Sequence, residues 1–222
     1  MKKINILYAM ALVSLASCKN NDWEFPDFEF QSVYFAYQTP VRTVTLGEDI
    51  FDNTLDNQHK VQVMATTGGV YNNKKDIRID FVVDNSLTNG LSYPNGQSIT
   101  PLPTSYYQLA SNQISIPNGS LTGGVEVQLT DAFFADPKSL ETYYVLPLRM
   151  TKVANADSIL SGKTSLQTAN RAIASDWDVA PKDFIFYALK YINPWHGNYL
   201  RRGTDQIVGK GANSNLTKNV VR

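Results

Sequence analysis

The sequence predicts an all-β fold, a sandwich of antiparallel strands, from two kinds of observation. Short runs in which apolar and polar residues alternate recur along the chain, as expected for strands with one buried face. Turn-forming Gly, Asn and Pro residues separate these runs at short intervals. Hydrophobic residues make up 43% of the 222-residue chain, which is ample for a packed core, and a single cysteine excludes an intrachain disulfide.

The alternation places the strands in order along the chain. They are expected around residues 33–37, 61–65, 77–83, 114–116, 125–129, 146–150 and 184–189. The clearest run is 77–83, where Ile77, Ile79, Phe81 and Val83 share one face, with Arg78, Asp80 and Asp84 opposite. Pro147 lacks a backbone N–H, so the strand around it is expected at a sheet edge or at a bulge. Only residues 132–139 and 157–174 suit short helical turns.

The N-terminus has the pattern of a lipoprotein signal peptide. Two lysines precede a mostly apolar run over residues 4–15, which is too short for a permanent membrane span. The sequence Leu15-Ala16-Ser17-Cys18 then matches a lipobox, in which small residues precede the thiol that becomes acylated. The alternative is an ordinary secretory signal in which Cys18 is a small buried residue.

These features divide the chain into five parts. We expect a signal peptide at 1–17, a lipidated tether at 18–30, a β-sandwich at 31–150, a linker with a final strand at 151–192, and the start of an incomplete C-terminal domain at 193–222. The chain has 20 basic and 20 acidic residues, and the leader removes two lysines. No basic excess remains that would favour nucleic acid as a partner.

Four segments carry a resemblance to a known family: 105–109, 114–120, 125–129 and 144–148. Together they resemble the Bacteroidetes domain of unknown function 1735. The resemblance covers roughly residues 30–190, and it implies an immunoglobulin-like sandwich at the N-terminus of a surface lipoprotein. Proteins of this family are often encoded beside Sus-type outer-membrane glycan importers, which implies such a complex as a partner.

A second resemblance covers residues 190–203, the sequence KYINPWHGNYLRRG. It is similar to the entry into a C-terminal domain of the unknown-function 4361 type. Because only about thirty residues of that domain are present, we expect a fragment or a truncated gene product.

The sequence shows no constellation of catalytic or metal-binding residues, so we predict no enzyme, no metal and no cofactor. The two histidines, His59 and His196, lie in polar turn segments and lack zinc-site spacing. Asp49, Asp52 and Asp56 cluster in one loop, but the positions that an EF-hand reserves for glycine and glutamate hold other residues. A solvated acidic loop is the preferred interpretation.

Glycan binding needs no catalytic group, because sugar rings stack on exposed aromatic side chains. The candidates are Trp177, Trp195 and Tyr107. Their structural alternatives are a ring that pins the linker, a hinge-packing residue and a core tyrosine. We therefore predict an accessory to glycan binding and uptake, held through Cys18 to the lipid bilayer of the outer membrane at the cell surface. The alternative is a structural or protein-interaction module without a ligand.

Overall fold

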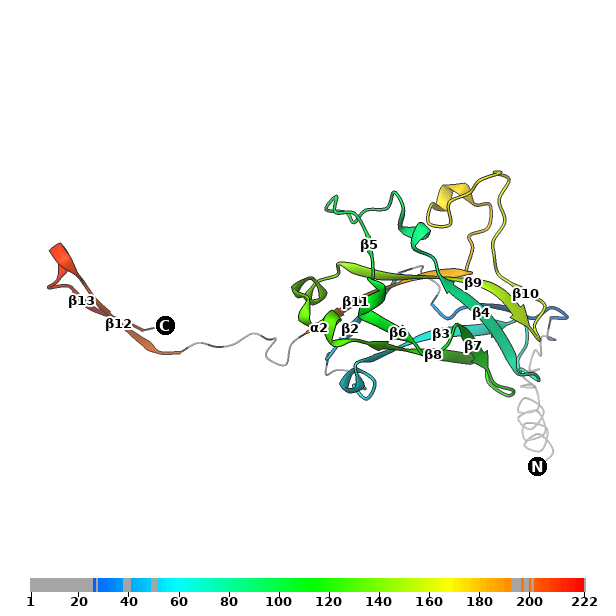
Figure 1. Cartoon of the computed structure of the whole chain (residues 1–222), viewed down its shortest axis with the longest axis horizontal. Helices are drawn as coiled ribbons and strands as arrows, with labels where there is room; N and C mark the ends of the chain where they lie inside the picture. Colours follow the sequence, from blue (N-terminus) through cyan, green and yellow to red (C-terminus); the bar gives the residue numbers. More distant parts are fainter. Residues whose placement is uncertain are drawn as a thin grey trace, which may run out of the picture.

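Two facing β-sheets form the body of the protein in the computed structural model (Figure 1). The structure describes residue 26, residues 28–37, 41–48 and 52–192, residues 197 and 200, and residues 202–221. The first sheet has the order β10 (Ser158–Ile159), β1 (Ser32–Phe35), β3 (Lys60–Gly68), β8 (Thr122–Leu129), β6 (Tyr107–Leu109). The second has the order β2 (Val41–Leu46), β11 (Phe184–Tyr191), β9 (Tyr144–Ala154), β4 (Ile77–Val83), β7 (Gln113–Ile116), with β5 (Thr100–Pro101) paired to β9.

Within the described ranges, helical structure consists of short pieces. The helix α2 (Asp131–Ala135) and the 3-10 turn η4 (Pro137–Leu140) lie where residues 132–139 predict helical turns, so that prediction is confirmed. The other 3-10 turns are η1 (Asp56–Gln58), η2 (Asn85–Thr88), η3 (Thr104–Tyr106), η5 (Ala174–Asp176) and η6 (Gly211–Asn213). Among the residues that the structure describes, no helix is long and apolar enough to cross a bilayer.

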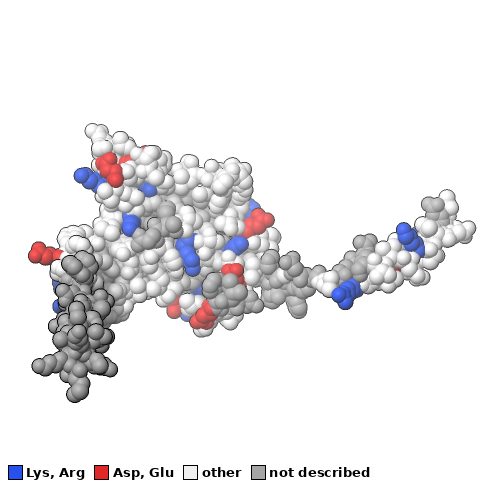
Figure 2. Space-filling view, turned by 180° about the vertical axis from the view of Figure 1, so that it is seen from behind, with Lys and Arg blue, Asp and Glu red and all other residues white. Residues whose placement is uncertain are grey.

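The main core lies between the sheets and is built from the alternating residues of the predicted strands. Val63, Ile79, Ile114 and Leu146 are all 0% exposed. Because period-two alternation puts every second residue inside, burying them stabilises both sheets at about 25 cal/mol per Å² of apolar surface. The predicted all-β sandwich is therefore confirmed. Charged residues lie scattered over the surface, with both signs mixed on the face in Figure 2.

Tyr187 ties the two sheets together through the core. Its ring is 1% exposed, and its hydroxyl accepts a hydrogen bond from the backbone N–H of Met64 on β3, at 3.1 Å. Burial raises the pKa of Tyr187 to about 12. A tyrosine on β11 of the second sheet thus satisfies a backbone donor of the first.

Three parts of the prediction are wrong in detail. Pro147 lies in β9, a central strand, where it pairs with Phe186; the register shift between β4 and β9 falls near Asp80, away from the proline. The carbonyl of Pro147 still accepts a hydrogen bond from Asp84 N at 3.0 Å. Residues 157–173 form β10 and a long loop rather than helical turns, and the 3-10 turn η5 begins only at Ala174, the last residue of the predicted range. Finally, β2, β10 and β5 pair in parallel, not antiparallel, with their neighbours.

Strands β12 (Thr204–Val208) and β13 (Thr217–Val221) form an antiparallel hairpin that stands apart from the sandwich (Figure 1). This hairpin falls within 193–222, where the sequence predicts the start of a second domain. That domain assignment stays a prediction.

Candidate functional site

The outer face of the second sheet is covered by two loops, and the candidate site lies there. Strand β11 is buried on both faces: Ile185 and Tyr187 belong to the main core, whereas Phe184 and Phe186 pack in a second apolar cluster with Leu87. The covering segments are residues 84–101, called the 84–101 loop, and residues 160–183, called the 160–183 loop. Both rise from the same side of the sandwich (Figure 1).

Arg149 and Asp84 meet beneath the two loops. Alternation along β9 points Leu148 and Met150 into the core and leaves Arg149 on the outer face, beside the end of β4. Its Nε donates to Asp84 Oδ2 at 2.7 Å. Burial raises the pKa of Asp84, but hydrogen bonds from Ser86 and Arg149 and the charge of Arg149 outweigh it, so the pKa lies below its usual value. Asp84 is thereby held as a carboxylate that accepts hydrogen bonds.

The 160–183 loop is organised by Arg171 and Asn170. Arg171 donates through Nε and Nη2 to Asp183, which is only 2% exposed, at 3.1–3.3 Å. The carbonyl of Asn170 accepts from the indole N–H of Trp177 at 2.8 Å, and its amide N–H donates to Asp176 Oδ2 at 2.8 Å. These bonds fix the loop in one shape.

Three neighbouring cavities lie on this face of the second sheet. The middle one, about 590 Å³, lies between the loops and has a mostly polar lining; its residues are Asp84, Ser86, Leu87, Arg149, Thr168, Ala169, Asn170, Arg171 and Asp176. A second, about 650 Å³, lies within the 84–101 loop and shares Ser86 with the middle one. A third, about 180 Å³, shares Arg171. We call the three together the loop cleft.

The smallest cavity of the loop cleft is aromatic. Tyr37 and Trp177 both line it, together with Phe184 from β11. The guanidinium of Arg42 lies 4.5 Å from the centre of the Tyr37 ring, and that of Arg171 lies 5.9 Å from the Trp177 ring. Because these contacts already restrict the rings, a ligand that stacks on them costs little further side-chain conformational entropy.

The structure separates the residues that the sequence offers as glycan contacts. Trp177 lies in the loop cleft, and it also pins the 160–183 loop, so both interpretations of it apply. Tyr107 lies on β6 of the first sheet and packs against the main core, and it lines none of the three cavities. Burial raises the pKa of Tyr107. Trp195 and Cys18 lie outside the described residues.

Four further cleft residues are not predicted by the sequence: Tyr37, Arg149, Arg171 and Asn170. One signal was available, because the alternation of residues 146–150 already points Arg149 away from the core. Nothing in the sequence pairs it with Asp84 or brings the 160–183 loop beside the 84–101 loop. That proximity arises from the pairing of β9 with both β4 and β11.

A second polar cluster lies at the end of the sandwich around Asp136. Its Oδ2 accepts hydrogen bonds from the hydroxyls of Tyr144 at 2.6 Å and Tyr106 at 3.0 Å, and these bonds, with one from Lys138 N, lower the pKa of Asp136. Burial, and then Asp136, raise the pKa of Tyr144. The bond from Lys138 N caps η4, and those from Tyr106 and Tyr144 join this segment to η3 and β9, which is a structural role.

Comparison with known proteins gives a family and a strong structural relative. Residues 28–157 match a family model described as an N-terminal domain. A crystal structure of a protein of unknown function from Bacteroides ovatus is similar, with 49% identity and a TM-score of 0.79 over 88% of this chain. The chain spans only 61% of that protein's length. No curated protein matches the chain.

Two further solved structures are similar at a lower level. A multidomain protein from Bacteroides ovatus that includes the domain of unknown function 1735 has 14% identity and a TM-score of 0.45, with 87% of this chain and 56% of that one covered. An auxiliary nutrient binding protein from Bacteroides thetaiotaomicron has 11% identity and a TM-score of 0.41, with 83% and 56% covered.

Proposed function

Because the chain belongs to the family of N-terminal domains that residues 28–157 match, we propose that it is the membrane-proximal, non-catalytic part of a glycan-binding envelope lipoprotein. Cys18 is acylated and holds the domain to the outer membrane at the cell surface. A C-terminal domain of the 4361 type begins at residue 193, and a Sus-type importer is the partner that receives the glycan.

The observation that carries this proposal is the composition of the loop cleft. Glycans present apolar C–H faces beside hydroxyl groups, so their sites combine aromatic rings with fixed hydrogen-bonding side chains. Tyr37 and Trp177 supply the rings. Asp84, Arg149 and Asn170 supply acceptors and donors in the adjoining cavity, and their own hydrogen bonds hold them in place.

The electrostatics of the cleft favour binding over hydrolysis. Glycoside hydrolysis needs a carboxylic acid whose pKa is raised so that it can protonate the leaving oxygen. The pKa of Asp84 is instead lowered. The other carboxylate in the middle cavity, Asp176, accepts a hydrogen bond from Asn170 N. Both are suited to accept hydrogen bonds from sugar hydroxyls.

Affinity electrophoresis tests this function. The mature chain is run through gels that contain single soluble plant or host polysaccharides, and we expect at least one to retard it. Tyr37→Ala and Trp177→Ala each remove one stacking ring, which is worth roughly 1 kcal/mol or more, and should weaken the retardation about fivefold or more.

Tyr71→Ala is the matched control, because Tyr71 is 69% exposed and lies outside the loop cleft. It should leave retardation unchanged, and thermal melts of all three variants check that each is folded. Absence of retardation by every polysaccharide would favour the structural or protein-interaction module. Retardation that survives both cleft variants would place the glycan elsewhere.

A further inference from the structure

Large apolar side chains are exposed to solvent at one end of the sandwich. They belong to three neighbouring segments: residues 28–31, which lead into β1, the loop at 69–76 and the turn at 117–121. Phe28 is 77% exposed, Tyr71 69%, Phe30 55% and Leu121 40%. We call these four residues the tether-end patch. Exposed apolar side chains that cluster in this way mark a surface that contacts something else.

The backbone beneath the patch is firmly held, so its rings are presented at a defined place. Phe28 N donates to Gly69 O at 2.9 Å, and Gln31 N donates to Asp157 Oδ2 at 2.7 Å. Gly69 has φ +95°, and a Cβ there would stand 2.2 Å from Phe30 O, so the two segments meet this closely only because the residue is glycine.

Asn73 joins all three segments under the patch. It is 1% exposed, its Nδ2 donates to the carbonyls of Lys75 and Pro117 at 2.7 and 3.0 Å, and its Oδ1 accepts from Gln31 Nε2 at 3.3 Å. Such a buried and fully bonded amide fixes the relative positions of the segments that carry the exposed rings.

The patch lies where the predicted tether enters the domain. Ten residue steps separate Cys18 from Phe28, so the acylated residue is at most about 35 Å from the patch even with the intervening chain fully extended. We propose that the tether-end patch rests on the lipid surface in which Cys18 is anchored, with its aromatic rings at the depth of the headgroups. This placement rests on the proposed anchor.

Two physical arguments favour a lipid surface. Phe, Tyr and Leu side chains are those that insert into the headgroup boundary of a bilayer. The tether also keeps the patch beside the membrane at a millimolar effective concentration, so a weak affinity is sufficient for lasting contact.

Charge contributes little to this contact. The ionisable side chains within the same segments, or bonded to them, are Glu29, Lys74, Lys75, Asp76 and Asp157, which carry mixed signs. Docking should therefore depend little on salt or on anionic lipid.

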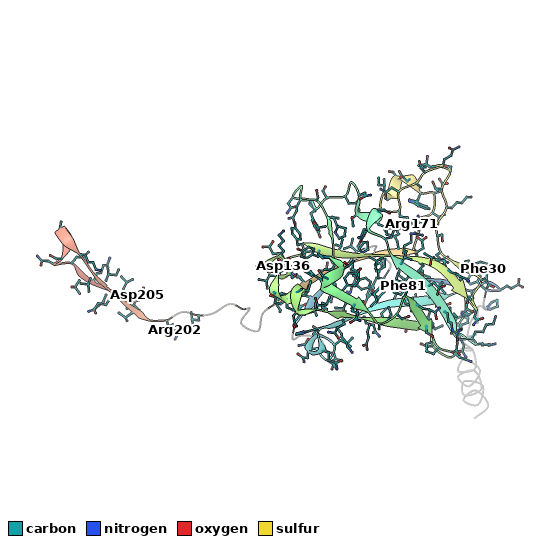
Figure 3. All side chains as sticks on the ribbon, viewed as in Figure 1. Phe30, Phe81, Asp136, Arg171, Arg202 and Asp205 are labelled. Carbon is teal, nitrogen blue, oxygen red and sulfur yellow. The ribbon has the colours of Figure 1, made fainter. Side chains whose placement is uncertain are left out.

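Docking at this end leaves the loop cleft accessible. Phe30 lies at the end of the sandwich opposite Asp136, while Arg171 lies on a loop that rises from the side (Figure 3). The 84–101 and 160–183 loops would therefore point sideways, parallel to the membrane surface, and remain accessible to solvent. The sandwich would lie with its long axis directed away from the bilayer.

A fluorescent reporter of local polarity tests the docking without relying on acylation. The mature chain from Lys19 carries a hexahistidine segment in place of Cys18, which is its sole cysteine, and binds nickel-chelating lipid in phosphatidylcholine vesicles. Tyr71→Cys then provides one thiol for a nitrobenzoxadiazole label. We expect its emission to shift to the blue and to rise about twofold on vesicles, because the label enters the headgroup region.

Leu140→Cys is the matched control, since Leu140 is 42% exposed and lies in η4 near Asp136 at the opposite end. Its label should not respond to vesicles. Adding Phe28→Ser and Phe30→Ser to Tyr71→Cys should abolish the response while the protein still floats with the vesicles.

Equal responses at positions 71 and 140, or a response that survives the two serine substitutions, would overturn the proposal. A blue shift that needs no vesicles and grows with protein concentration would also overturn it, in favour of a second copy. Failure of Cys18 to become acylated would remove the native anchor but would leave this measurement interpretable.

Discussion

Replacement of Gly123 by alanine should destabilise the sandwich by roughly 3 kcal/mol, and more if the strands cannot separate. Gly123 begins the buried part of β8, and a Cβ there would stand 2.0 Å from Ser115 O and 2.9 Å from Ile116 Cα. Both atoms are backbone of β7, which belongs to the other sheet. No rotamer change can relieve such a clash, so the sheets themselves must move. Urea unfolding of Gly123→Ala measures the loss.

The neighbouring Gly124 is a control in the same strand. A Cβ at this position would meet Met64 Sδ at 2.5 Å and the side chain of Gln62 at 3.0 Å. Because these are the ends of flexible side chains, Gly124→Ala should cost about 1 kcal/mol. Equal losses for the two variants would show that the close approach of β7 and β8 does not limit the packing of the sheets.

Replacement of Arg171 by alanine should also cost roughly 3 kcal/mol, because it leaves the Asp183 carboxylate buried without its cation. Asp183 is 2% exposed, and the Arg171 side chain retains 29% exposure, which places the effect at the lower end of the range for buried pairs. The same change should abolish glycan retardation, since Arg171 lines both the polar and the aromatic cavity of the loop cleft. Chemical unfolding and affinity gels measure the two effects separately.

A double-mutant cycle isolates the pair. Arg171→Ala combined with Asp183→Asn removes the stranded charge, so the double variant should be more stable than the sum of the single losses predicts, by about 1 kcal/mol or more. Strict additivity would mean that the bidentate contact contributes nothing to folding, and that the 160–183 loop is held by its other bonds.

The strands with one buried face were predictable because their period-two pattern is a direct consequence of the core. Ile77, Ile79 and Phe81 lie inside as the alternation requires. The sequence does not predict strand β2. Its first residues are exposed and only Leu46 is fully buried, so its apolar and polar residues do not alternate. Pro147 wrongly indicated an edge strand or a bulge. Its missing backbone N–H is tolerated within the central strand β9, where its carbonyl still accepts a hydrogen bond from Asp84 N.

The loop cleft was largely beyond sequence reasoning. Its two walls, the 84–101 and 160–183 loops, are far apart along the chain and meet because β4 and β11 both pair with β9. Trp177 stood out because a large ring among polar residues is unusual. The alternation of residues 33–37 places Tyr37 on the same face as Val33 and Phe35, but β1 ends at Phe35, and the Tyr37 ring lines the cleft.

Amide hydrogen exchange, with and without a polysaccharide that retards the chain, tests most directly whether the cleft between the two loops is where this protein holds its glycan. Glycan bound there should slow exchange in the 84–101 and 160–183 loops and leave α2 and η4 unaffected. Protection confined to the far sheet, or to the end around Asp136, would contradict the account.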